Sequence, residues 1–177
     1  MDVDFLLIRN MKKGNEDAFS VFVRKYYDDI LKYCGYHCPD PEYAEDLAQE
    51  TFVHFFAKLS DYRHMGKAKN FLYTIAGNLC KNYFKKVKEI SLEDTELAEL
   101  AEEAEFTPDI LTKLEVEDAL KHLSDELRDV VVLYYFQDLK LSEIADVLQI
   151  GLPLVKYRMK QAKVQLKMYL EEGDYDI

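Results

Sequence analysis

Two stretches of helical periodicity, separated by a three-residue break, lie between Leu139 and Leu166 and constrain the fold more than any other part of the chain. In the first stretch, apolar residues recur at the spacing of one buried helix face: Leu141, Ile144, Ala145 and Leu148. Ser142 is expected to cap this helix, because its hydroxyl can accept a hydrogen bond from an amide that lacks a partner within the helix. In the break, Gly151 is expected to take the positive φ of a tight turn.

The second stretch predicts a longer helix that begins near Leu152, with Pro153 tolerated in its first turn. Its inward apolar positions are Leu152, Val155, Met159, Ala162 and Leu166. At about 100° per residue, a stripe of lysines runs beside them: Lys156, Lys160, Lys163 and Lys167. The sequence has no acidic residue between Leu152 and Leu170. Together the two stretches predict a helix-turn-helix whose second helix enters a DNA groove.

The polar side of this second helix supplies the candidate contacts to duplex DNA. Arginine can make a bidentate contact to guanine, whereas lysine more commonly meets phosphate, so we expect Arg158 to read a base. The predicted contacts are Lys156, Tyr157, Arg158, Lys160, Gln161 and Lys163. The alternative is an ordinary helical hairpin whose lysines form a solvated face.

The net charge of −11 looks wrong for a DNA-binding protein, but it is concentrated in one segment. Residues 89–118 carry 12 acidic side chains and one basic side chain, and so account for the whole imbalance. We expect this acidic connector to be mobile on its own, because its like charges repel and it has few apolar residues. No apolar run reaches the roughly 18 residues that span a bilayer, so no membrane insertion is expected.

The cysteine and motif content argues against a metalloprotein or an enzyme. Three cysteines leave at least one thiol unpaired, which favours a reducing, cytoplasmic location. Cys34 and Cys38, with His37 and His54, lack the spacing of a zinc site, so no metal or other cofactor is expected. The sequence has no phosphate-binding loop, metalloprotease motif or nucleophile elbow, and we expect no catalytic residues.

The first half of the chain predicts three or four helices and no strand. Asn15 can cap a helix whose inward positions are Ala18, Phe19, Phe22, Tyr26, Ile30 and Tyr33. A second helix follows the turn cluster 35–41, and a third follows a polar loop at 60–67. The predicted fold class is all-α, with two small helical domains, residues 1–88 and 110–177, joined by an acidic linker at 89–109. The second domain contains the helix-turn-helix.

Several segments of the chain match the motifs of one family. They are AFSVFVRKYYDDILKYC, PEYAEDLAQETFVHFFAKLSDY and FLYTIAGNLCKNYFKK in the first half, then ALKHLSDELRDVVVLYYFQDLKLSEIADVL and VKYRMKQAKVQL. The first three resemble region 2, and the last two region 4, of the extracytoplasmic-function (ECF) sigma factors of bacterial RNA polymerase. The blocks occur in the family's order and at its separation. Phe71 stands where the family usually carries a Trp.

The resemblance implies a non-catalytic specificity subunit whose partners are core RNA polymerase, promoter DNA and, as is usual in the family, an anti-sigma factor. Region 2 would bind the polymerase and capture the melted strand of the −10 element, and region 4 would read the −35 duplex. The polymerase-binding positions implied by the resemblance lie on one helix: Asp46, Leu47, Gln49, Glu50 and Phe52. Acidic and apolar groups on an exposed helix suit docking against a basic helical partner.

Residues 58–88 combine positive charge with aromatic rings, as single-stranded DNA binding requires. They carry eight basic side chains and one acidic side chain, Asp61. The loop before the last helix is where a flipped base could be gripped, and the resemblance implies the same loop. The predicted −10 contacts are Tyr62, Arg63, His64, Phe71, Asn78, Lys81 and Lys85. For Phe71, the spacing to Ile75 fits a core position at least as well.

Two other functions stay open at this stage. One is a self-sufficient helix-turn-helix repressor or activator, although a region 2 block without a sensing pocket or a dimerisation coiled coil argues against it. The other is a helical adaptor whose basic helix binds an acidic protein. Purification with core polymerase separates all three, because only a sigma factor should form a tight stoichiometric complex.

Overall fold

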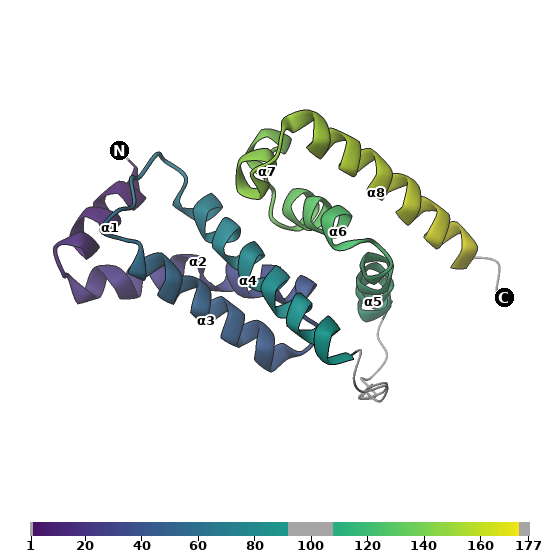
Figure 1. Ribbon diagram of the computed structural model, residues 1–177, viewed down its shortest axis with the longest axis horizontal. Helices are drawn as coiled ribbons and strands as arrows, with labels where there is room; N and C mark the ends of the chain where they lie inside the picture. The colour runs from purple at the N-terminus through teal and green to yellow at the C-terminus, as the bar shows by residue number, and fades with distance from the viewer. Residues whose placement is uncertain (1, 92–107, 174–177) are drawn as a thin grey trace. The chain divides into compact units, whose positions relative to one another are not determined.

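The computed structural model describes residues 2–91 and 108–173, and within these ranges every regular element is helical (Figure 1). The elements are α1 (Val3–Lys12), α2 (Glu16–His37), α3 (Pro41–Ala57), α4 (Ala68–Ser91), α5 (Pro108–Lys121), α6 (Asp125–Val131), η1 (Val132–Phe136), α7 (Leu141–Leu148) and α8 (Leu152–Gly173). The all-α prediction is confirmed. The part of the predicted linker that falls on residues 92–107 lies outside the described residues.

The chain divides into two compact units. The first unit comprises residues 1–84 with 145–149, and the second comprises residues 85–144 with 150–177. Each unit has buried apolar residues from several helices, as a small helical domain requires.

An aromatic cluster between α2 and α3 forms the core of the first unit. The ring of Phe22 is fully buried and stacks on Phe55, with 4.9 Å between ring centroids and 13° between planes. Tyr26 and Phe52 meet the same ring edge-on, at 5.2 and 6.5 Å. Such pairs stabilise a core beyond the area that they bury. The cluster follows from the predicted apolar stripe of α2, which begins at the predicted cap: the side chain of Asn15 accepts a hydrogen bond from the Ala18 amide at 3.1 Å.

α4 approaches α2 closely at Gly77. A Cβ atom at this position would lie 2.9 Å from the hydroxyl oxygen of Tyr33, a fully buried residue of α2. The ring of Tyr33 also packs against Tyr73, one turn before Gly77, with 5.4 Å between ring centroids. A larger side chain at position 77 would therefore require the Tyr33 ring or one of the two helices to shift.

A single arginine joins the helices at the start of the second unit. The guanidinium of Arg128, in α6, donates to three backbone carbonyls at and just beyond the end of α5, those of Leu120, Lys121 and Leu123. It also pairs with Asp125 at 3.3 Å. The last carbonyls of a helix lack amide donors within the helix, and here the Arg128 side chain donates to them from the next helix.

A wide helical turn, η1, follows α6 without a break. The amide of Gln137 donates to the carbonyl of Val132 at 3.2 Å, five residues back instead of the four of an α-helix. Two residues after the turn, Asp138 has a φ of 55°. Val132 and Leu133 are buried, whereas Tyr134, Tyr135 and Phe136 are exposed.

The two helices of the predicted helix-turn-helix are present as α7 and α8, but two details of the prediction were wrong. Ser142 does not cap α7: Lys140 precedes the helix, and its amide donates to the side chain of Glu143 at 2.9 Å. The positive φ belongs to Gln149, at 55°, and not to Gly151. The carbonyl of Gly151 instead accepts the first amides of α8, from Leu154 and Val155, so this glycine begins the next helix.

Candidate functional site

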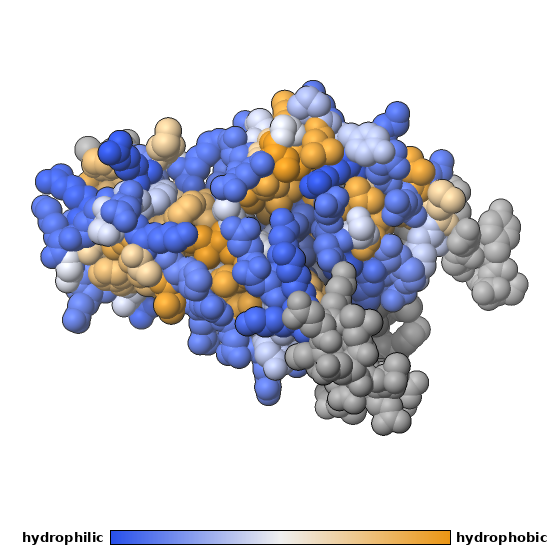
Figure 2. All heavy atoms as spheres, viewed as in Figure 1, coloured by the Kyte–Doolittle hydropathy of each residue, from blue (hydrophilic) through white to orange (hydrophobic). Residues whose placement is uncertain are grey.

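The acidic face of α3 consists of Asp46, Gln49 and Glu50, which are all exposed. Asp46 lies about one helical turn before the other two. Figure 2 shows mostly hydrophilic side chains over the lower edge of this helix. The other two predicted polymerase-binding residues lie elsewhere: Leu47 and Phe52 are buried, with 6% and 4% of their surface exposed. They hold α3 in the core. We therefore correct the predicted surface to its three polar members.

α3 is fixed at both ends by local interactions. Asp40 accepts a hydrogen bond from the Glu42 amide at 3.0 Å, and Pro41 occupies the first helical position, where its missing amide costs nothing. At the other end, the amide of Lys58 is shared among the last carbonyls. The acidic face is thus presented on a well-formed helix.

In the loop between α3 and α4, not all of the residues that were predicted to contact a flipped base are exposed. Tyr62 is half-buried, and its ring stacks on Phe71 with 5.1 Å between centroids and 27° between planes. It also meets Phe55 edge-on at 5.2 Å, and burial raises the pKa of its hydroxyl. The side chain of His64 is only 6% exposed. Phe71 therefore packs against Tyr62 and Phe55 on the inner side of the unit, as its spacing to Ile75 had allowed.

Exposed side chains alternate with these buried ones along the loop. Residues 62–65 have no regular structure; Tyr62 and His64 face inward, whereas Arg63 and Met65 are exposed, Met65 to 88%. Farther along α4, the predicted contacts Asn78, Lys81 and Lys85 are exposed. Of the predicted −10 contacts, Arg63 and these three residues are therefore exposed, whereas Tyr62, His64 and Phe71 are partly buried. Met65, which was not among the predicted contacts, is exposed as well.

The lysine stripe of α8 is exposed as predicted. Lys156, Lys160 and Lys163 are exposed, Tyr157 is 60% exposed, and Gln161 is half-buried. Arg158 was expected to read guanine, but it lies against α6: its guanidinium pairs with Glu126 at 3.2 Å, and its side chain is 17% exposed. Arg158 thus pairs with a residue that is distant in the sequence, and the local sequence pattern does not reveal that pair.

Two families of known proteins match the chain in separate segments: Sigma-70 region 2 matches residues 22–89, and Sigma-70 region 4 matches residues 113–166. The chain is 29% identical to the ECF RNA polymerase sigma factor SigW of Bacillus subtilis, over 93% of this chain and 95% of that protein. The chain belongs to the ECF sigma factors. It therefore functions as a sigma factor in promoter-specific initiation of transcription by RNA polymerase.

Other relatives of this sigma factor agree with that assignment. It is 29% identical to the RNA polymerase sigma factor YlaC of Bacillus subtilis, over 86% of this chain and 92% of that protein. Among solved structures, it resembles CnrH in complex with the cytosolic domain of CnrY, with a TM-score of 0.75 at 20% identity. That match covers 94% of this chain and 96% of CnrH, and it shows the same fold.

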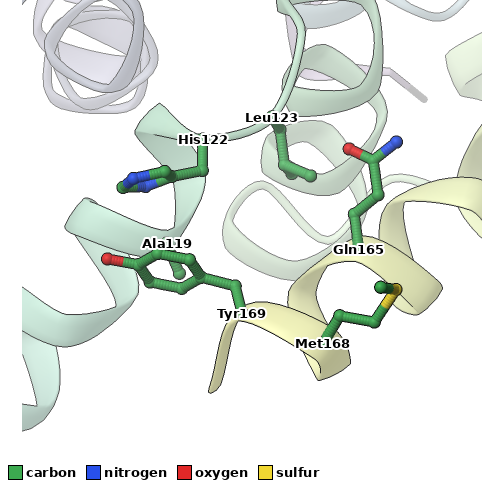
Figure 3. Close-up of a pocket in the computed structure, with 6 residues that line it drawn as sticks. All are labelled: Ala119, His122, Leu123, Gln165, Met168 and Tyr169. Atoms are coloured by element: carbon green, nitrogen blue, oxygen red, sulfur yellow. The ribbon is translucent and has the colours of Figure 1, made fainter. Parts of the chain in front are cut away.

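The sigma factor also has a small hollow between α5 and α8, shown in Figure 3. Its volume is about 220 Å³, and its lining is Ala119, His122, Leu123, Gln165, Met168 and Tyr169. The rings of His122 and Tyr169 stack with 4.1 Å between centroids. The hydroxyl of Tyr169 donates to Asp118 at 2.5 Å, and this hydrogen bond raises the pKa of the tyrosine. None of the residues that line the hollow is among the predicted DNA contacts.

Across the described ranges, no helix is both long and apolar enough to cross a membrane. The same residues contain no cluster of three or more His, Cys, Asp or Glu side chains that could hold a metal ion. The side chains of Cys34, Cys38 and Cys80 are buried.

Proposed function

We propose that this sigma factor binds core RNA polymerase through the acidic face of α3, reads the −35 duplex with α8, and meets the melted −10 strand with α4 and the loop before it. The observation that carries the proposal is the basic surface of α8, where four exposed lysines lie on a helix without an acid between Leu152 and Leu170. Positive charge along one helix is the footprint of a duplex-binding element.

The acidic face of α3 supports a different partner for the first unit. Asp46 and Glu50 would repel DNA phosphates, but they suit a basic helical segment of a protein. We propose that residues 1–88 and 110–177 act as separate domains joined by the linker 89–109, that the protein catalyses no reaction itself, and that it acts in the cytoplasm. The likeness to RpoE, solved with the anti-sigma factor NepR from Bartonella quintana, supports an anti-sigma factor as a further partner; its TM-score is 0.67 at 18% identity, over 90% of this chain.

The proposal predicts that the protein forms a stoichiometric complex with core polymerase. Reversing an acidic charge on α3 should lower the affinity of this complex. The full chain is mixed with core bacterial RNA polymerase, and complex formation is measured by gel filtration and titration. Asp46→Lys should lower the affinity about tenfold or more, because it places like charges in the interface. Asp28→Lys, which reverses an exposed acid in the middle of α2, is the matched control and should bind as the native chain does.

Run-off transcription from a genomic promoter library then tests initiation itself. The reconstituted holoenzyme should select a set of promoters that core polymerase alone does not use. Absence of a complex with core polymerase, combined with tight binding of duplex DNA by the isolated chain, would instead identify a self-sufficient repressor or activator.

A second prediction concerns the salt dependence of promoter binding by the holoenzyme. A lysine that meets a phosphate releases about 0.9 of a counterion, so Lys156→Gln, Lys160→Gln and Lys163→Gln should each lower the slope of log affinity against log salt by about 1. Arg158→Met should change this slope less, because Glu126 already neutralises Arg158.

The matched control is Lys121→Gln, an exposed lysine at the end of α5. If Lys121→Gln and the α8 variants changed the slope equally, general charge rather than α8 would account for binding.

A further inference from the structure

The N-terminal end of α1 contacts the loop between α3 and α4 through Asp2. One carboxylate oxygen of Asp2 caps α1 by accepting from the Asp4 amide at 3.0 Å. The other accepts from Nε2 of His64, in the loop, at 2.5 Å. These bonds lower the pKa of Asp2, with the His64 bond as the larger cause. Because a carboxylate only accepts, Nε2 of His64 is the donor in this bond, and Nδ1 of the same ring lies 3.4 Å from the hydroxyl oxygen of Tyr62.

The C-terminal end of α1 contacts the same loop through Lys12. The ammonium group of Lys12 donates to the carbonyl oxygen of Tyr62 at 2.6 Å. Tyr62 and His64 are two residues apart, whereas Asp2 and Lys12 stand at opposite ends of α1. The loop therefore runs alongside the helix, and Figure 1 shows it passing α1 on its way from α3 to α4.

α1 packs against α2 and is hydrogen-bonded to it, so its position relative to the loop is fixed. Asp4 is buried, and it accepts from the ammonium of Lys25 at 2.7 Å and from the hydroxyl of Tyr26. Burial is the main cause that raises the pKa of Tyr26 to about 12, with the Asp4 bond as a second cause. Ile8 and Met11, on the same side of α1, are also buried.

The contacts with α1 decide which loop side chains face solvent. In an extended segment, successive side chains point to opposite sides. Because Tyr62 and His64 are held on the inner side by Lys12, Asp2 and the ring of Phe71, Arg63 and Met65 are turned outward. Arg63 can donate to a base edge or phosphate, and Met65 offers a polarisable apolar surface to a base.

We propose that α1 is a positioning element for promoter opening: Asp2 and Lys12 hold the loop so that Arg63 and Met65 meet the melted −10 strand. This inference rests on the proposed function of the loop. It assigns base contact to Arg63 and Met65 and makes Asp2 and Lys12 positioning residues, which act on the DNA only through the loop.

The test measures discrimination between two promoters by reconstituted holoenzyme. One promoter is selected from genomic fragments by the native holoenzyme; the other is a copy with an altered −10 element and the same −35 element. The rate of strand opening is followed by permanganate reactivity of unpaired thymines, and the ratio of the two rates is the readout. Asp2→Ser keeps a good helix cap but removes the acceptor for His64, and Lys12→Met removes the ammonium but keeps the side-chain length.

Both variants should lower the ratio about tenfold, the effect of losing one well-placed base contact. Their affinity for core polymerase should not change, because α3 is untouched. Lys12→Arg, which can still donate to the Tyr62 carbonyl, should keep most of the native ratio. Lys13→Met is the matched control, because it removes the neighbouring exposed lysine, and it should keep the full ratio.

Arg63→Ala and Met65→Ala in the same assay separate the two levels of the inference. If they lower the ratio but Asp2→Ser and Lys12→Met leave it at the native value, α1 has no positioning role, and the proposed function of the loop stands. If none of the four variants changes the ratio, the loop does not select the strand, and both proposals are overturned.

Discussion

Replacing Phe22 by alanine is expected to lower the free energy of unfolding of the first unit by about 3–5 kcal/mol, because it opens a cavity in the aromatic cluster. Phe22 is fully buried, and its ring contacts Tyr26, Phe52 and Phe55. The loss combines the transfer free energy of the ring with the contacts that the surrounding rings can no longer make. α2 and α3 then lose their main shared contact, and the acidic face of α3 is presented less often.

Urea unfolding of the full chain, followed by far-ultraviolet circular dichroism, measures this effect. The control is Val21→Ala on the same helix, where the side chain is 48% exposed and the expected change is below about 0.5 kcal/mol. Similar losses in the two variants would mean that the aromatic cluster does not dominate the stability of this unit, since alanine is a better helix former than either residue and helix propensity alone would raise the stability.

Arg128→Met is expected to lower the stability of the second unit by about 2–4 kcal/mol, since it removes a donor from three carbonyls at and just beyond the end of α5. Of these, the Leu120 carbonyl keeps one partner, the Leu123 amide at 3.2 Å. The side chain of Arg128 is 12% exposed, so water can replace few of these bonds. The shortest of them joins Nε to the Leu120 carbonyl at 2.9 Å. Methionine keeps much of the packing of the aliphatic stem, so the change reports chiefly on the guanidinium.

Two further variants test whether the several N–H donors of the Arg128 guanidinium, and not its charge alone, stabilise the second unit. Arg128→Lys keeps the charge but presents a single point donor, so it should recover less than half of the loss. Lys121→Met removes a cation from the exposed end of the same helix and should have little effect. Thermal unfolding of the full chain compares the three. Full recovery by Arg128→Lys would show that charge at the end of α5, rather than the carbonyl bonds, stabilises the unit.

The sequence was sufficient for the helices that carry a long, unbroken apolar period. Asn15 caps α2 as predicted, and the buried residues of this helix follow the predicted stripe, because a 22-residue helix repeats its apolar pattern over six turns. α1 was not separately predicted, although Asp2 precedes an apolar stretch as a cap would. α1 has only 10 residues, and the buried Asp4 interrupts its core-facing side. Its apolar pattern is therefore too weak to predict the helix.

The predicted binding surfaces were less accurate, because exposure depends on partners that are distant in the sequence. Arg158 pairs with Glu126, 32 positions earlier, and His64 bonds with Asp2, 62 positions earlier. No local pattern could reveal these pairs. By contrast, the exposed lysines of α8 were predicted correctly, because their spacing beside the apolar stripe already places them on the outer face of the helix.

The wide turn η1 makes this part of the second unit tolerant of changes in chain length. A turn with a five-residue hydrogen bond holds one residue more than an α-helical turn. Each residue rotates an α-helix by about 100°, so an insertion without such a turn would carry every later buried position to a different face. In η1 the extra residue is absorbed locally. The loss of one residue at this point would restore an ordinary turn, with Val130 before it and Leu139 after it both still facing the core. A gap in an alignment of sigma factors can therefore fall at η1 without a change of fold.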